Sequence, residues 1–178
     1  MADYPYKKQY EKLVSGIIWT HKIQCCYLEH LVVVNKWLKI VKYFFAAWDS
    51  ISTVITAIFD YKTATIILGL VTVGALFLNL LLDNIVSDKG IKELMVQTSG
   101  LCKLRDEILV TIEEIEAGKI NEDVTKQYFL FYDGQYQEIC SKLPIVSDKY
   151  VGIAGKKLND RKDEEPNPEF FEGKHEPK

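Results

Sequence analysis

Two apolar segments separated by only four residues constrain this chain more than any other feature. Tyr43–Phe59 contains 17 residues, Ala64–Leu82 contains 19, and Asp60–Thr63 lies between them. As a helix rising 1.5 Å per residue, the second segment would span roughly 28 Å, close to the hydrocarbon core of a bilayer. The pair therefore predicts a transmembrane helical hairpin. A hairpin buried inside a soluble protein is the alternative.

The fold class that follows is an all-α membrane protein, in which a two-helix transmembrane hairpin joins a long N-terminal helix to a cytoplasmic helical bundle. We expect four regions, with these boundaries: an N-terminal cytoplasmic helix at 1–36, the hairpin at 37–83 with spans at about 41–59 and 64–82, a cytoplasmic helical region at 84–158, and a charged, disordered tail at 159–178. No proline lies between residue 6 and the end of the first span, so one continuous helix is expected there.

The region after the hairpin carries clear helix signals. Residues 91–117 place an apolar side chain at every seventh position: Leu94, Leu101, Ile108 and Ile115. This spacing predicts a helix with one buried face. Gly118 is expected to end that helix, Asn121 to cap the next one, and Pro144 to end it.

Lysine placement indicates an orientation for the hairpin. Lys36, Lys39 and Lys42 precede the first span, and two more lysines follow the second. The positive-inside rule then predicts that both termini are cytoplasmic. Residues 1–42 hold seven lysines against three acidic residues, which suits contact with anionic membrane lipid.

The first span has a polar side. Its members recur at offsets of 3, 4, 7 and 11, which is one face of a helix: Asp49, Ser52, Thr53, Thr56 and Asp60. A carboxylate at mid-bilayer costs about 2.5–3.5 kcal/mol, so such groups usually face a protein interior or water. We expect this face to line a cation-selective pore formed by several hairpins. Alternatively, the hydroxyls bond to their own helix and Asp49 lies near the interface.

The second span carries small and hydroxyl-bearing residues along one side. These residues are Thr65, Gly69, Thr72 and Asn79. Such residues typically mark a surface where transmembrane helices pack closely. We therefore interpret this side as a helix-packing face.

Arg105 is one of two arginines in the chain and lies close to the apolar positions of residues 91–117. A guanidinium in that place needs a partner. One hypothesis is a structural salt bridge to a glutamate of a neighbouring helix. The other is a clamp for an anionic ligand, helped by Lys103 or Lys22.

No motif indicates catalysis, a cofactor or a metal ion. The run from His21 through Cys25 and Cys26 to His30 resembles a metal site in composition, but on one helix the first two residues and the last two face different sides. A metal bridging helices is the open alternative. The chain lacks a Gly-rich phosphate loop and the common nucleophile motifs, so we expect it not to be an enzyme.

Three sequence features together resemble the SLATT family, the SMODS- and SLOG-associating two-transmembrane effectors of bacterial anti-phage defence. They are Ile18-Trp19-Thr20-His21-Lys22, Leu104-Arg105-Asp106-Glu107-Ile108-Leu109, and Leu143-Pro144 followed by Tyr150-Val151-Gly152-Ile153-Ala154. The resemblance covers about residues 6–158. The Cys25-Cys26 pair and Gly152 depart from what the family pattern leads us to expect.

The resemblance implies a homo-oligomeric effector that forms a gated pore in the inner membrane of an infected cell. Its control would come from a nucleotide or oligonucleotide made by a nucleotidyltransferase, or from a partner protein. The alternative is a non-conducting, membrane-anchored interaction module that recruits a soluble partner.

Overall fold

The computed structural model describes residues 6–58, 69, 72–74, 77 and 87–160. Its helices are α1 (Lys7–Ile58), α3 (Asp88–Glu116), α4 (Glu122–Lys142) and α5 (Asp148–Asp160). Within the described residues there is no β-strand. The chain divides into two compact units, one made of Met1–Leu28 with Glu93–Lys178 and the other of Glu29–Lys92. Each unit is described separately below, and the first is called the bundle.

Helix α1 is continuous over 52 residues, as the absence of an internal proline predicted. Its only glycine, Gly16, lies in the bundle, where Tyr136 of α4 approaches closely. The Tyr136 hydroxyl donates a hydrogen bond to the Gly16 carbonyl oxygen at 3.2 Å. A Cβ at Gly16 would lie 3.5 Å from that hydroxyl, which is an ordinary van der Waals contact, so the approach of Tyr136 does not itself require glycine.

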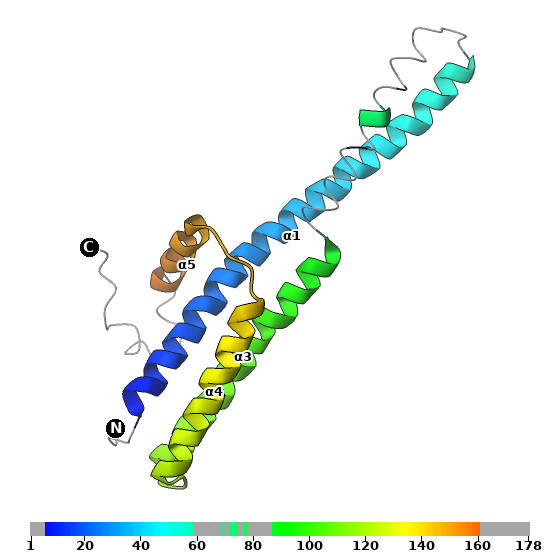
Figure 1. Cartoon of the computed structure of the whole chain (residues 1–178). Helices are drawn as coiled ribbons and strands as arrows, with labels where there is room; N and C mark the ends of the chain where they lie inside the picture. The colour runs from blue at the N-terminus through cyan, green and yellow to red at the C-terminus, as the bar shows by residue number, and fades with distance from the viewer. Residues whose placement is uncertain (1–5, 59–68, 70–71, 75–76, 78–86, 161–178) are drawn as a thin grey trace. The chain divides into compact units, whose positions relative to one another are not determined.

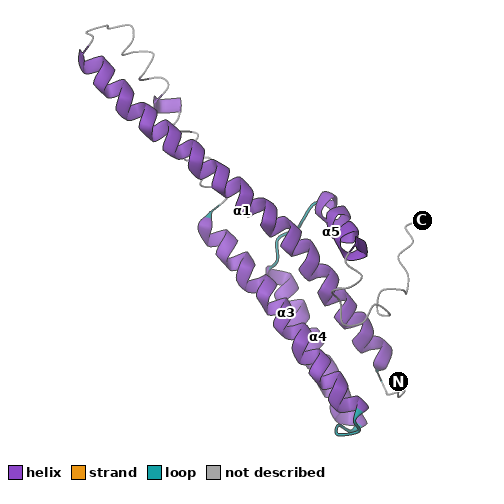
Figure 2. Cartoon of the chain, turned by 180° about the vertical axis from the view of Figure 1, so that it is seen from behind, coloured by secondary structure: helices purple, strands orange, loops and turns teal. Residues whose placement is uncertain are grey.

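The core of the bundle is formed by α1, α3 and α4, and Figures 1 and 2 both show α3 and α4 side by side. Its buried members are Tyr10, Leu13, Val14, Ile17, Leu101, Leu104, Ile108, Ile112, Ile115 and Tyr132. The predicted seven-residue spacing on α3 is confirmed, because all four of its residues are buried. Burying these side chains is the main source of stability for the bundle.

Buried hydroxyl groups connect the helices across this core. Tyr10 is fully buried, and its hydroxyl donates to the backbone oxygen of Thr125 at 3.0 Å. The hydroxyls of Thr111 and Tyr132 lie 2.8 Å apart, joining α3 to α4. Each of these buried hydroxyl groups thus keeps a partner, which avoids the cost of an unsatisfied buried group.

The predicted helix boundaries are confirmed. Gly118 adopts φ +70° just after α3, in the left-handed region that glycine occupies at low cost. Asn121 caps α4, and its side-chain oxygen accepts a hydrogen bond from the Val124 amide at 2.9 Å. Helix α4 ends at Lys142, because Leu143 precedes Pro144 and is extended.

Helix α5 packs on the bundle part of α1 through aromatic contacts. Tyr27 and Tyr150 meet edge-to-face with ring centroids 5.3 Å apart. A Cβ on Gly155 would lie 3.4 Å from the Trp19 ring, and Ala154 between these contacts is fully buried. The predicted tail at 159–178 lies outside the described residues, except that Asn159 and Asp160 belong to α5.

The predicted transmembrane hairpin is wrong. In the part of the chain that the structure describes, no helix is both long enough and apolar enough to cross a membrane. This finding also contradicts a multi-pass inner-membrane localisation. Helix α1 falls short because Asp49 and several hydroxyl-bearing residues lie within its apolar segment, and a charged residue at a helix centre opposes insertion by about 2.5–3.5 kcal/mol. Most of the predicted second span, 64–82, lies outside the described residues.

Candidate functional site: an exposed apolar face on α1

In the unit Glu29–Lys92, α1 exposes large apolar side chains; six of them lie along one side, while Val32 and Tyr43 lie off it. We call the six residues the 33–48 face: Val33, Trp37, Ile40, Val41, Phe44 and Trp48. Trp37 and Phe44 are each 63% exposed, and Trp48 is 48% exposed. Single exposed apolar residues are ordinary on protein surfaces, but a contiguous group of this kind usually marks an interaction site.

The 33–48 face follows a regular spacing. Val33, Trp37, Ile40 and Phe44 are separated by 4, 3 and 4 residues, and the same alternation continues along α1 to its end, through Ala47, Ile51, Val54 and Ile58. The side chains of residues 49–58 are outside the described set, so only their positions along the helix are used. Alternation of three and four is the pattern by which one helix packs along another in a coiled coil.

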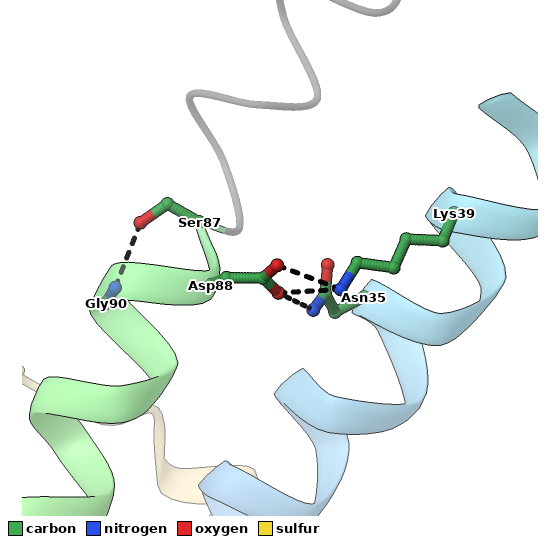
Figure 3. Close-up of polar contacts among 5 residues, drawn as sticks. All are labelled: Asn35, Lys39, Ser87, Asp88 and Gly90. Carbon is green, nitrogen blue, oxygen red and sulfur yellow. Dashed lines mark hydrogen bonds and ion pairs between the residues drawn. The ribbon is translucent and has the colours of Figure 1, made fainter.

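The opposite side of α1 contacts the start of α3. Asn35 and Lys39 each follow a residue of the 33–48 face by two positions, which is about 200° around the helix. Both side chains donate to Asp88, as Figure 3 shows. The Asn35 amide lies 2.6 Å from Asp88 Oδ1, and the Lys39 ammonium lies 2.9 Å from each carboxylate oxygen. Contact with α3 therefore leaves the 33–48 face uncovered.

Asp88 also begins α3, where the exposed backbone N–H groups of the first turn favour a negative charge. Ser87 precedes it, and its hydroxyl accepts a hydrogen bond from the Gly90 amide at 3.0 Å. Hydrogen bonds from Lys39 and then from Asn35 lower the pKa of Asp88 below its ordinary value of 3.8. The carboxylate is therefore the form that joins the two helices.

We expect Asp88→Asn to lower the melting temperature at pH 7 but not at strongly acidic pH. The pKa of Asp88 is lower in the folded state than in the unfolded state. Its contribution to stability is therefore present above the unfolded-state pKa and is lost as the pH falls through the folded-state pKa. Thermal melts of both proteins across this range measure the difference. A deficit that persists unchanged in acid would contradict an ionic role for Asp88.

The residues predicted to line a pore lie on α1 or beyond its end. Three of these positions lie on the same side of α1 as Asn35 and Lys39. They are Asp49, Thr53 and Thr56, and each follows a position of the three–four spacing by two residues. Ser52 lies beside them in the helix. The side chains of all four are outside the described residues, as is the whole of Asp60. Their spacing is equally that of the polar side of an amphipathic helix, and the pore-lining role stays a prediction.

Of the predicted helix-packing residues, Thr65 and Asn79 lie outside the described residues. Thr72 is half-buried. Gly69 is exposed, and a Cβ added to it would meet nothing within 4 Å. The helix-packing role of this face stays a prediction.

Arg105 pairs with its own neighbour in the sequence. Its guanidinium lies 2.7 Å from Asp106 Oδ1, and the Arg105 side chain is 35% exposed. Among the described residues the ion pair of Arg105 is therefore with Asp106 of the same helix and not with a glutamate of a neighbouring helix. Lys103 is exposed and Lys22 half-buried, and neither arrangement demonstrates a bound anion.

A histidine of α1 contacts two cysteines in the bundle. His21 Nε2 lies 3.4 Å from Cys25 Sγ, one turn along α1, and 3.0 Å from Cys102 Sγ on α3. Burial lowers the pKa of His21 below 6.5, and the charges of Arg105 and Lys22 lower it further. Among the described residues no group of three or more His, Cys, Asp or Glu side chains is arranged to hold a metal ion.

We expect acidification below pH 6.5 to destabilise the bundle through His21. The folded state keeps the imidazole neutral, while the unfolded chain takes up a proton at a higher pH, so stability falls as the pH drops through 6.5 towards the lowered folded pKa. In His21→Gln the melting temperature should vary less between pH 7.5 and pH 5.5. The matched control is His30→Gln, since His30 lies exposed on the same helix. If the pH dependence of the melting temperature weakened equally in both variants, the effect could not be assigned to His21.

Comparison with known proteins adds no relative. No family model, no curated protein and no solved structure matches this chain.

Proposed function

We propose that this protein is a homo-oligomeric helical module in which the 33–48 face of α1 assembles copies of the chain. The observation that carries the proposal is the exposed three–four alternation of apolar residues from Val33 to Phe44. The bundle supplies a folded body for each copy, and α1 supplies the contact. No catalytic residue is assigned.

The exposed apolar area of the 33–48 face is large enough for a stable protein–protein contact. From their exposed fractions, the six side chains of the 33–48 face present roughly 700 Å² of apolar surface, which approaches the ~800 Å² per partner of a standard protein interface. Trp37, Phe44 and Trp48 provide most of it, and aromatic residues are typical of interface centres.

A second copy fits this face better than an unrelated partner does. The three–four alternation continues to Ile58 without a charged residue at any of its positions. Coiled-coil packing requires the same alternation on the facing helix, and another copy of α1 supplies it at equal length. Lys39 and Lys42 lie on the other side of α1, and Lys36 lies at the edge of the face beside Trp37.

Co-purification of two tagged versions of the full chain tests the proposal. Both versions are expressed together, one tag is captured, and the other is quantified. We expect substantial recovery of the second version and little recovery when both carry Trp37→Glu and Phe44→Glu. Recovery of the captured version alone, or its binding to lipid vesicles without self-association, would contradict the proposal.

A role in anti-phage defence is a further hypothesis. The resemblance to the SLATT family implies an effector controlled by a nucleotide or oligonucleotide signal, or by a partner protein. A self-assembling module is compatible with such control, because a nucleotide or partner protein that changes the oligomeric state would change the activity of the assembled protein. Titrating candidate nucleotides while following the oligomer mass would test this link; an unchanged mass with every nucleotide would count against it.

A further inference from the structure

The contacts of His21 bring together two thiols that are far apart in the sequence. Cys25 and Cys102 are separated by 77 positions, yet both sulfurs lie within hydrogen-bonding reach of the same imidazole nitrogen. We call His21, Cys25 and Cys102 the thiol cluster. All three side chains are half-buried, so a small reagent has access to them, and all four cysteines of the chain are present as thiols.

The geometry of the thiol cluster suits the transfer of a proton from a thiol to the imidazole. Arg105 and Lys22 are both close enough to His21 to act on it electrostatically. The thiolate is the nucleophilic form of cysteine, so a proton acceptor beside the thiol promotes attack by the sulfur. The neutral imidazole can also accept the proton that Cys102 releases, because Nε2 and Sγ are 3.0 Å apart.

We propose that the thiol cluster is an oxidation site at which a hydroperoxide converts Cys25 and Cys102 into a disulfide joining α1 to α3. This assignment is independent of the proposed self-association, since the cluster lies in the bundle and the 33–48 face does not.

The chemistry proceeds in two balanced steps. The Cys102 thiolate attacks the distal oxygen of the hydroperoxide, the O–O bond breaks, and the alkoxide leaves as an alcohol after taking the proton passed through His21; the sulfur becomes a sulfenic acid. The Cys25 thiolate then attacks that sulfur, the S–O bond breaks, and the hydroxyl leaves as water with the proton from Cys25. Two thiols and one hydroperoxide thus give one disulfide, one alcohol and one water.

The other two cysteines lack this arrangement. Cys26 is 5% exposed and packs inside the bundle. Cys140 lies on α4 beside Tyr136, whose pKa is raised mainly by burial. The structure therefore predicts a selective product rather than general oxidation of the chain.

Hydrogen peroxide added to the full chain tests this selectivity. In a Cys26→Ala variant, trypsin releases residues 23–36 with Cys25 as their only cysteine, and residues 93–103 with Cys102. We expect these two peptides to appear linked without reductant, and the intact chain to lose two hydrogens. Cys140→Ser should leave the product unchanged, whereas Cys102→Ser should abolish it. A disulfide that involves Cys140, or sulfonic acids without any linkage, would overturn the proposal.

The role of His21 has a separate test. In His21→Gln the disulfide should form at least about tenfold more slowly, while circular dichroism shows the same helix content. If the contacts of His21 were only structural, the substitution would change the melting temperature but not the rate of disulfide formation at neutral pH. An unchanged rate would overturn the proton-accepting role that the geometry gives to His21.

Discussion

Ile108→Ala is expected to lower the free energy of unfolding by about 2–5 kcal/mol, the range for deleting a fully buried aliphatic side chain. Ile108 has no exposed surface and belongs to the core that α1, α3 and α4 share. The substitution removes buried apolar area and leaves a cavity that three packed helices can fill only in part. Urea denaturation followed by circular dichroism measures the loss.

Val110→Ala is the matched control for this core prediction. Val110 lies two residues further along α3 and is 56% exposed, so its truncation should change stability by no more than about 0.5 kcal/mol. Similar losses in the two variants would show that α3 does not bury the side that carries Ile108.

The double substitution Trp37→Glu with Phe44→Glu is expected to abolish self-association. Burying each aromatic side chain contributes about 1.5–3 kcal/mol, so replacing both should weaken association by on the order of a hundredfold or more. Neither side chain is buried within its own chain, so helix content should stay the same. Analytical ultracentrifugation measures the association, and circular dichroism measures the helix content.

Ala46→Glu provides the control for the added charge. Ala46 is exposed and follows Phe44 by two residues, which places it about 200° away on α1. A glutamate there should leave the oligomer intact. Equal dissociation by Ala46→Glu would mean that negative charge anywhere on this part of α1 disrupts assembly, which would contradict a specific face.

Local signals in the sequence were sufficient to predict the bundle. The seven-residue spacing of Leu94, Leu101 and Ile108 predicts the buried side of α3, and Gly118 and Asn121 predict where helices end and begin. These predictions succeeded because each depends on a few neighbouring residues and on backbone geometry. Tyr10 was not among the predicted core residues, since its burial requires Thr125 of α4 to accept its hydroxyl.

The membrane prediction failed because average hydrophobicity does not show which side of a helix is apolar. The sequence interpretation assigned Lys42 to the membrane surface and Asp49 to a pore lining, although both residues equally mark the polar side of an amphipathic helix. The three–four spacing from Val33 to Ile58 was visible in the sequence and would have indicated the exposed face. Nothing in the sequence pairs His21 with Cys102, because that contact depends on how α1 and α3 pack.

Sedimentation equilibrium of the full chain over a range of concentrations tests the central claim most directly, because it measures mass without any assumption about shape. The chain has a mass of 20.5 kDa. If the 33–48 face assembles copies of the protein, the measured mass will be a multiple of this value and will fall to 20.5 kDa in the Trp37→Glu, Phe44→Glu variant. A wild-type mass of 20.5 kDa at every concentration would contradict the account.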